Sequence, residues 1–256
     1  MDSSQASRTK DENVETRTTA DAKSKDQNNL FVVKTYPNGS KYEGAFENGQ
    51  RHGKGKLTTP HGAWYEGDFT HDKLHGVGTH FCPKRGKYEG EFRNSTMHGK
   101  GERQLPCGTK YKGEFEANRE HGYGERTLSE HYTYKGEFQN GKYNGYGQLA
   151  EQKAGQIGLT YTGEFKEDKY NGRGMIKYST GDMYEGGYKN NKRHGFGRYT
   201  FANGMIYEGI WKDEDNQMYG KGKFMTSDGK TKYKGEFVAS RLHGRGTFKV
   251  KVLHCS

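Results

Sequence analysis

A short phrase recurs nine times in this chain and constrains its fold more than any other feature. Each copy alternates an aromatic residue, a glycine and a second aromatic residue, and a sequence of the type His-Gly-x-Gly follows ten residues after the first aromatic. The copies lie 23 residues apart in six of the eight intervals, and 27 and 26 residues apart in the other two. A fixed period in this range is typical of repeat arrays, which display a repeated surface rather than one unique pocket. The first aromatics are Tyr42, Tyr65, Tyr88, Tyr111, Tyr134, Tyr161, Tyr184, Tyr207 and Tyr233.

The composition limits the kind of core that such an array can bury. Only 29% of the residues are apolar, whereas the chain has 39 glycines and 19 tyrosines. We therefore expect one thin sheet lined by aromatic rings, each of which removes roughly 150–250 Å² from water. The net charge of +10 favours acidic partners, but 32 acidic residues are interspersed among 42 basic ones. This mixture indicates a general attraction to anions and no dedicated nucleic-acid site.

The cysteines and the lack of targeting signals predict a cytoplasmic protein. Cys82, Cys107 and Cys255 have no CxxC spacing, which is typical of reduced thiols inside the cell. No apolar run approaches the roughly 20 residues of a spanning helix. No signal-peptide core or lipidation motif is recognisable either, so any membrane contact is expected to be peripheral.

The chain divides by composition into a tail and an array. Residues 1–29 contain neither an aromatic residue nor a glycine, and we expect a disordered polar tail there. Residues 30–256 contain the repeats. The first strands are expected at Phe31–Tyr36 and Lys41–Phe46, and a turn at Glu47–Arg51 leads to His-Gly-x-Gly, which should open the return strand.

The alternation within each strand predicts two different faces. Tyr42, Gly44 and Phe46 fall on one face, whereas Glu43 and the equivalent outward residues, Glu114 among them, should point to solvent. The expected fold is an all-β, elongated, single-layer antiparallel meander of repeated hairpins, about 85 Å long for eighteen strands at ~4.8 Å each. Phe31–Tyr36 and Thr247–Val252 should close its edges, with lysines discouraging strand addition.

The repeated phrase YxGxF-x5-HGxG resembles the MORN (membrane occupation and recognition nexus) repeat over residues 42–246. Tyr65-Gly67-Phe69 followed by His75-Gly76-Val77-Gly78 is one such match. The resemblance implies an elongated sheet of hairpins. Some repeats depart from the pattern, and we expect longer loops there. The departures are Asn144 and Asn171 in place of histidine, Tyr188 and Trp211 in place of the second aromatic, a late Tyr219-Gly220-Lys221-Gly222, and a stretched region at Glu151–Gly158.

The repeated polar residues do not form a recognisable catalytic or metal site. Histidines at equivalent positions of adjacent hairpins should lie roughly 9–10 Å apart, too far to share one metal ion. No helix follows the glycines of His-Gly-x-Gly, so they are not expected to form a phosphate-binding loop. The carboxylates point outward beside lysine and arginine, so they are not expected to form a catalytic acid–base pair in a pocket. We therefore expect no catalytic residue, no metal, no cofactor and no enzymatic activity. The equivalent histidines are His52, His75, His98, His121, His194 and His243.

Two sets of residues are candidate binding sites. The second aromatics could leave an open groove for a partner's helix or extended segment, because one sheet has no obvious cover. They are Phe46, Phe69, Phe92, Phe115, Phe138, Phe165, Tyr188, Trp211 and Phe237. The cations at the variable position of His-Gly-x-Gly could bind anions. They are Lys54, Lys100, Arg173 and Arg245.

Two functions remain open. The first is a non-catalytic scaffold that joins other proteins in a cytoskeletal structure. The resemblance to MORN proteins without an appended domain, such as radial spoke head components, implies the axoneme of a cilium or flagellum. The second is a peripheral membrane adaptor that binds anionic lipids or phosphoinositides, against which the mixed charges and the lack of a tight basic cluster argue. Homo-oligomerisation is also left open.

Overall fold

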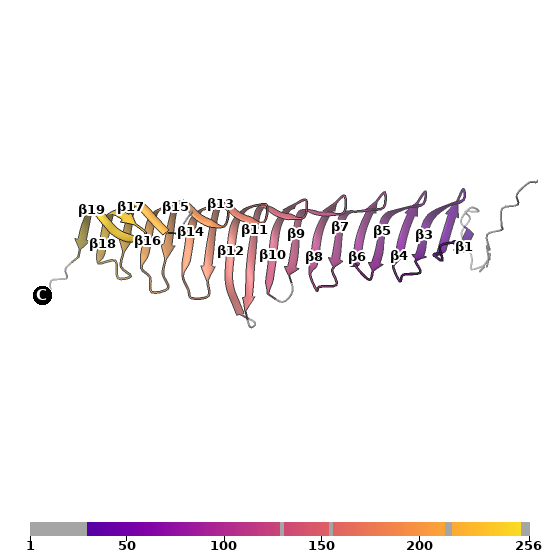
Figure 1. The fold of residues 1–256 in the computed structure, drawn as a ribbon, viewed down its shortest axis with the longest axis horizontal. Coiled ribbons are helices and arrows are strands. Elements are labelled where there is room, and N and C mark those ends of the chain that lie inside the picture. Colours follow the sequence, from indigo (N-terminus) through magenta and orange to yellow (C-terminus); the bar gives the residue numbers. More distant parts are fainter. Residues whose placement is uncertain (1–29, 129–130, 154–155, 213–216, 252–256) are drawn as a thin grey trace, which may run out of the picture. The chain divides into compact units, whose positions relative to one another are not determined.

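The computed structural model describes residues 30–128, 131–153, 156–212 and 217–251 (Figure 1). The predicted disordered tail, residues 1–29, lies outside this part of the chain. The described residues form nineteen β-strands and no helix, and so include no helix that could cross a membrane. The predicted all-β antiparallel meander is confirmed.

Contacts divide the chain into two units. Unit 1 comprises residues 1–108 and 115–118, and unit 2 comprises residues 109–114 and 119–256. Within each unit, the strands pair antiparallel with their neighbours in chain order. The strands of unit 1 are β1 (Leu30–Thr35), β2 (Lys41–Glu47), β3 (Gln50–Thr58), β4 (Trp64–Thr70), β5 (Lys73–Cys82), β6 (Gly86–Arg93) and β7 (Thr96–Gln104).

Strand β8 (Lys110–Glu116) contains residues of both units. The remaining strands belong to unit 2. They are β9 (Arg119–Leu128), β10 (Tyr132–Gln139), β11 (Lys142–Lys153), β12 (Gln156–Lys166), β13 (Lys169–Tyr178), β14 (Met183–Lys189), β15 (Lys192–Thr200), β16 (Ile206–Lys212), β17 (Gln217–Met225), β18 (Thr231–Val238) and β19 (Arg241–Val250).

The repeat hairpins whose turns lie in the described residues turn within two residues, which is tighter than the sequence suggested. In the first hairpin Asn48 and Gly49 have φ values of 48° and 76°. Two successive positive φ values match the right-handed twist of the flanking strands, as in type I′ turns. The return strand β3 therefore begins at Gln50, before His52, and His-Gly-x-Gly lies inside the strand rather than at its start.

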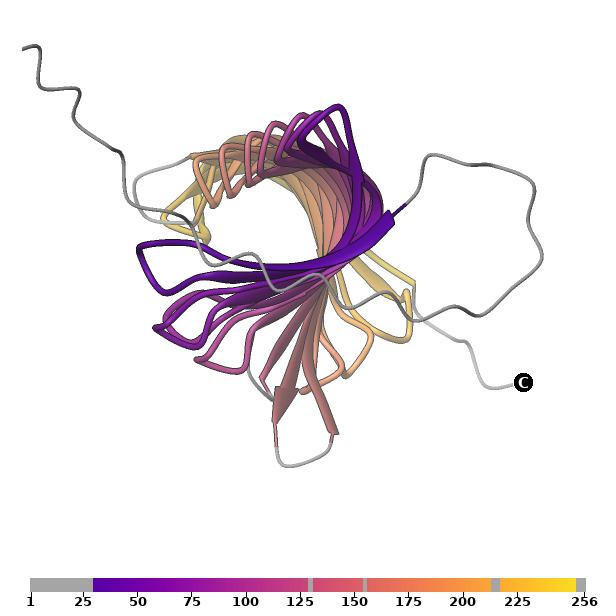
Figure 2. The same ribbon diagram turned by 90° about the vertical axis from the view of Figure 1, so that its right-hand side faces the viewer.

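A bulge at His-Gly-x-Gly bends each hairpin. Gly53 has a φ of +64°, and the pairing of β2 with β3 shifts register between Gly44 and Phe46. Figure 2 shows the resulting curvature of the strands. In several repeats a carboxylate from the facing strand accepts the hydrogen bond of the amide that the bulge leaves unpaired. Oε1 of Glu91, for example, lies 2.9 Å from the amide nitrogen of Lys100.

The first tyrosine of most repeats packs flat on a cross-strand pair of glycines, whereas in the repeat of Tyr207 the side chain of Met218 takes this place over Gly209 and Gly222. Gly44 and Gly55 face each other in the register of β2 and β3, and a Cβ on Gly55 would come 2.6 Å from Cζ of Tyr42. The Tyr42 hydroxyl donates a hydrogen bond to the carbonyl oxygen of Ala45 (2.9 Å). The glycines are therefore required because the ring occupies the space of their side chains.

The bend places a second layer over these rings. The residue before His52 or its equivalent covers the tyrosine on the side away from the glycines. Tyr143 stacks on Tyr134 with centroids 3.8 Å apart, and the Arg193 guanidinium lies 4.9 Å from the Tyr184 centroid. This layer buries the tyrosines although the sheet is single.

One repeat uses a buried ion pair in this second layer. Glu120, only 2% exposed, pairs with the guanidinium of Arg126. The same guanidinium donates a hydrogen bond to the Gly141 carbonyl oxygen (2.6 Å) and lies 4.9 Å from the Phe138 centroid. The pair therefore replaces an apolar cover at this position.

From the second repeat on, the described hairpin turns also dock on the hairpin that precedes them. The amide of Asp72 donates to the carbonyl oxygen of Arg51 (3.0 Å), and Oδ1 of Asp72 accepts from the Arg51 amide (3.0 Å) and from its Nε (2.9 Å). Asn118 makes the same reciprocal backbone and side-chain bonds to Met97. These bonds form a clamp that recurs along both units.

The long interval between Tyr134 and Tyr161 forms extended strands rather than the expected loop. β11 and β12 continue to pair as far as Lys153 and Gln156, with a bulge between Glu151 and Gln152. Backbone pairing satisfies the extra amides, and this explains why the insertion is absorbed as strand. The other predicted insertion, before Tyr219, falls largely on residues 213–216, outside the described part.

The two edge strands lie close to where the sequence placed them. β1 covers Leu30–Thr35 and pairs with β2, whereas Phe31–Tyr36 was expected. β19 extends from Arg241 to Val250 and pairs with β18, and all of its residues are exposed. Val252 lies outside the described residues.

Candidate functional site

The second aromatics, predicted to line an open groove, belong to the core. Most of these rings meet the tyrosine of their own repeat and of the preceding one edge to face at about 5 Å, as Phe69 does with Tyr65 and Tyr42. The pattern is weaker around Tyr207, whose ring lies tilted and 6.1 Å from that of Phe237. Phe46, which has no tyrosine before it, is half-buried. The groove interpretation is therefore corrected, because a partner could reach the other rings only by opening the core. The buried members are Phe69, Phe92, Phe115, Phe138, Phe165, Tyr188, Trp211 and Phe237.

The surface open to partners is the opposite face of the sheet, here called the outer face. It carries the residues that alternate with the ring-bearing positions along each strand. The variable residue of His-Gly-x-Gly lies on it in every repeat. The four predicted anion-binding cations are all exposed there, but they do not form one site.

Lys54 has an acidic neighbour on the outer face. Its Nζ lies 2.7 Å from Oδ1 of Asp68, its partner in the register of β3 and β4. Burial would raise the pKa of Asp68, but hydrogen bonds from Lys54 and from the Val77 amide outweigh it and lower that pKa. Lys54 is thus partly neutralised, which makes it a weak anion site.

On β14, Arg173 faces no acidic residue, because its register partner there is Gly187, where six other repeats carry a carboxylate. On the other side, in β12, Oε1 of Glu164 accepts a hydrogen bond from the Arg173 amide (2.7 Å). Arg173 lines a hollow of about 790 Å³ in unit 2 together with Tyr146, Phe196 and Arg198. Tyr146 is 58% exposed and Phe196 is 62% exposed.

Exposed apolar side chains continue on both sides of Arg173. Tyr123 occupies the variable position one repeat before Tyr146, and Ile210 pairs in register with Phe196. We call Tyr123, Tyr146, Arg173, Phe196 and Ile210 the aromatic stripe. Exposed apolar side chains that cluster in this way mark interaction sites, and the stripe is one such feature of the described residues.

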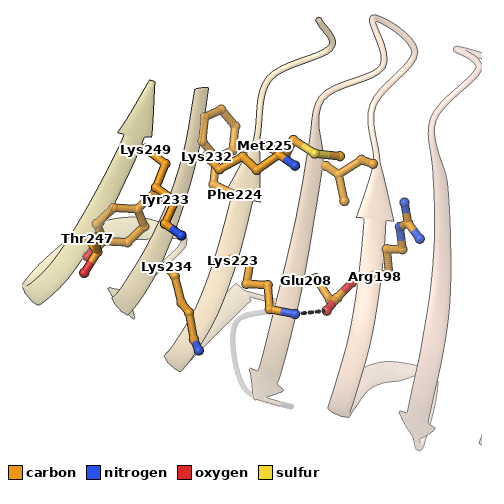
Figure 3. Close-up of a pocket in the computed structure, with 11 residues that line it drawn as sticks. Arg198, Glu208, Lys223, Phe224, Met225, Lys232, Tyr233, Lys234, Thr247 and Lys249 are labelled. Carbon is orange, nitrogen blue, oxygen red and sulfur yellow. Dashed lines mark hydrogen bonds and ion pairs between the residues drawn. The ribbon is translucent and has the colours of Figure 1, made fainter. Parts of the chain in front are cut away.

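A basic hollow lies next to the aromatic stripe on β15–β19. Figure 3 shows the side chains around this space of about 440 Å³. Glu208 is its one carboxylate, and Nζ of Lys223 lies 3.1 Å from Oε1 of Glu208. Five cations against one carboxylate leave a net charge of +4. The cations are Arg198, Lys223, Lys232, Lys234 and Lys249.

Arg245 lines an adjoining hollow, which shares Glu208, Lys223 and Lys234 with the basic hollow. Of the four predicted anion sites, this is the one that belongs to a basic cluster. The other lysines of the basic hollow lie outside the variable position of His-Gly-x-Gly and were not predicted. Their signal in the sequence is the run of basic residues at the remaining outward positions of the last repeats.

Comparison with known proteins agrees with the geometry of the hairpins. The model of the MORN repeat matches residues 42–63, 65–87, 88–109, 111–130, 134–150, 161–183, 184–206 and 233–249. The chain belongs to the MORN repeat family. The repeat that starts at Tyr207 is not matched, although strands β16 and β17 form there.

MORN repeats are generally non-catalytic modules of scaffolds for protein or membrane interaction. No curated protein matches this chain. Among solved structures, the chain is similar to selenomethionine-substituted virginiamycin B lyase from Staphylococcus aureus, with 9% identity and a TM-score of 0.16 over 87% of this chain and 94% of that one. This likeness is too slight to support any argument.

Proposed function

We propose that this MORN protein is a non-catalytic scaffold that joins other proteins within a cytoskeletal structure, and that the aromatic stripe is its main binding surface. The observation behind this proposal is the exposure of Tyr146 and Phe196 on either side of Arg173. Aromatic residues and arginine are enriched where protein interfaces gain most of their energy. The preferred partner is a protein segment with apolar side chains and an acidic residue that meets Arg173.

The more specific part of the proposal is the axoneme of a cilium or flagellum, in the manner of a radial spoke head component. The axonemal assignment is supported only by the resemblance to MORN proteins of this kind. A tagged copy followed in ciliated cells tests it. Enrichment along the axoneme is expected, and exclusion from it would contradict the assignment.

The proposed surface is tested with a photo-reactive amino acid at position 196. Cross-linking to a cytoskeletal protein is expected from this position. The double variant Tyr146→Ser and Phe196→Ser should lose that partner. Val77 is the matched control, because it occupies the same repeat position in unit 1 and is 57% exposed. If Val77→Ser weakened binding equally, the aromatic stripe would not be the site.

The basic hollow favours a second function, a peripheral adaptor for anionic lipid. Exposed charge contacts fade as salt shortens the Debye length to ~8 Å at physiological ionic strength. Vesicles rich in phosphatidylserine should then bind at low salt and release as salt rises, and Lys232→Glu with Lys234→Glu should abolish binding. Binding of the protein partner should survive the same salt and the same substitutions.

A further inference from the structure

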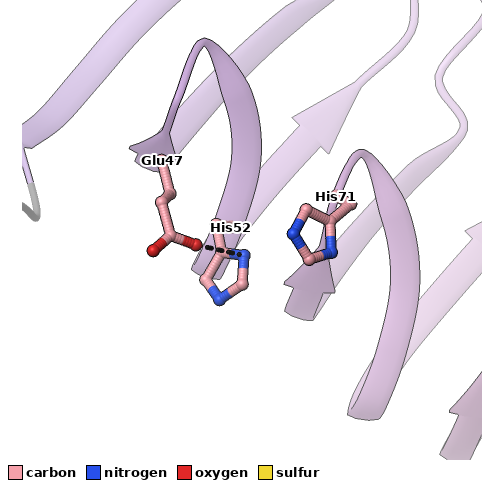
Figure 4. A group of neighbouring side chains, drawn as sticks. All are labelled: Glu47, His52 and His71. Atoms are coloured by element: carbon pink, nitrogen blue, oxygen red, sulfur yellow. Dashed lines mark ion pairs between the residues drawn. The ribbon is translucent and has the colours of Figure 1, made fainter.

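Three side chains with metal-binding chemistry meet at the first two turns of unit 1. Glu47 ends β2, His52 lies in β3, and His71 is in the turn between β4 and β5 (Figure 4). One oxygen or nitrogen atom from each lies within 4.8 Å of those of the other two. Among the described residues this is the one group of its kind.

The spacing of Glu47 and His52 already suits a shared ion. Oε2 of Glu47 lies 3.1 Å from Nδ1 of His52. Two ligands bound to zinc at about 2.0–2.2 Å in tetrahedral geometry lie roughly 3.3 Å from each other. Nδ1 of His52 is buried and makes no hydrogen bond within the described part of the chain, although it is close to Glu47. A bond to a metal ion would satisfy this atom.

His71 provides the third ligand from the neighbouring hairpin. Its ring lies edge to face with that of His52, with centroids 5.4 Å apart, and Figure 4 shows a nitrogen of His71 turned toward His52. The clamp between Asp72 and Arg51 holds this turn against β3. Because His71 itself is exposed, its side chain can rotate to complete the coordination.

Among the described residues the set occurs once, because His71 does not follow the repeat. Histidines at equivalent positions of adjacent hairpins are too far apart to share an ion, but His71 is not equivalent to His52. At the first turn residue, which has positive φ in every described hairpin of the repeats, the other described repeats carry different side chains. These are Asn48, Asn94, Ala117, Asn140, Glu167, Asn190 and Ala239.

We propose that Glu47, His52 and His71 bind one divalent transition-metal ion of the zinc class, with water completing the coordination. Two imidazoles and a carboxylate suit zinc, whereas calcium and magnesium prefer oxygen ligands throughout. The bound ion ties the first hairpin to the second. It therefore stabilises the start of the array.

The test uses the full chain, stripped of metal and titrated with Zn²⁺ by calorimetry, together with thermal unfolding. One ion per chain and a rise in Tm are expected, with no response to Mg²⁺. His71→Asn places a side chain found at this turn in other repeats, and should weaken Zn²⁺ binding by more than tenfold. His52→Asn should do the same. In Co²⁺-loaded protein both substitutions should abolish the visible absorption of imidazole-bound metal.

The second hairpin provides a matched control within unit 1. His75 occupies the position of His52, but Thr70 and Asn94 stand where Glu47 and His71 would be. His75→Asn should leave Zn²⁺ binding unchanged, whereas Thr70→Glu with Asn94→His should create a second site and raise the stoichiometry to two. Absence of the first site, or binding that His71→Asn leaves intact, would overturn the proposal.

Discussion

The phenol ring of Tyr65 occupies the space that a side chain on Gly78 would need. A Cβ on Gly78 would lie 2.6 Å from Cζ of Tyr65, and one on Gly67 would lie 2.6 Å from its hydroxyl oxygen. Gly67 and Gly78 face each other in the register of β4 and β5. The tyrosine and the two glycines thus form one packing unit in eight of the nine repeats, with Met218 in place of Tyr207 in the other, and this explains their joint recurrence.

Gly67→Ala should destabilise the protein by about 1–3 kcal/mol, because the added methyl group overpacks this unit. Glu66→Ala on the outer face removes an exposed ion pair with Lys56 (3.1 Å) and should cost well under 1 kcal/mol. Urea unfolding followed by circular dichroism measures both. Equal shifts in the two variants would contradict the assignment of the faces.

Phe165→Ala should cost about 3–5 kcal/mol, since the ring is buried between Tyr134 and Tyr161 at centroid distances of 5.0 Å. Phe196→Ser should change stability by no more than about 0.5 kcal/mol, because that ring is mostly exposed. Thermal unfolding of both variants separates core from surface. A large loss at Phe196 would show that this ring supports the fold.

Glu120→Ala should destabilise unit 2 by about 3–5 kcal/mol, because it leaves the Arg126 guanidinium buried without its carboxylate. The double variant Glu120→Leu and Arg126→Leu should recover most of this loss, since Leu74 and Leu57 stand at the same repeat positions in unit 1. Chemical unfolding of the three proteins gives the comparison. A double variant as unstable as the single one would mean that the pair has no apolar substitute.

Because the first tyrosines of the repeats are buried, we expect the protein to unfold in alkali. Burial raises the pKa of Tyr42 from 10.0 to about 12 and raises the pKa of Tyr65 and Tyr88 as well. Below pH 10 both the folded and the unfolded states keep these phenols neutral, so their contribution to stability is fully present. As the pH rises from 10 towards 12, the unfolded chain ionises first and stability falls, by about 1.4 kcal/mol per pH unit for each tyrosine.

Phenolate absorbance followed together with circular dichroism tests this prediction. The buried first tyrosines of the repeats should ionise together, as the sheet unfolds. Tyr65→Phe should cost about 0.5–1.5 kcal/mol at neutral pH, because it removes the hydrogen bond to the Asp68 carbonyl oxygen, and should make the alkaline loss less steep. Independent titration of every tyrosine near pH 10 in a folded protein would refute the prediction.

The hairpins and the faces of the sheet follow from the sequence because both depend on local periodicity. Tyr42, Gly44 and Phe46 share a face whatever the neighbouring hairpin does. The cover over the rings could not be predicted in the same way. It depends on the bulge at Gly53 and on residues such as Tyr143, whose role appears only once the strands bend.

The candidate sites were less predictable because they arise from exceptions to the repeat. Glu114 is exposed, as expected, but Glu91, Glu137 and Glu164 at the same position also hydrogen-bond to bulge amides, which spacing did not predict. Arg173 is distinctive because Gly187 stands opposite it, a cross-strand relationship that spacing alone does not reveal. The cluster of Glu47, His52 and His71 likewise depends on a turn residue outside the repeated phrase.

The clamp between consecutive hairpins implies an order in which the hairpins of the array are completed, from the N-terminus onwards. Asp72 closes on Arg51, and Asn118 on Met97, so the groups that complete each hairpin lie about one repeat further along the chain. During synthesis from the N-terminus, a hairpin can therefore be secured as soon as the next turn has emerged, without waiting for the C-terminal strands. During translation, each hairpin can therefore be folded and clamped before the later ones are made. Only the most recently synthesised strand would then have an unpaired edge that could pair incorrectly.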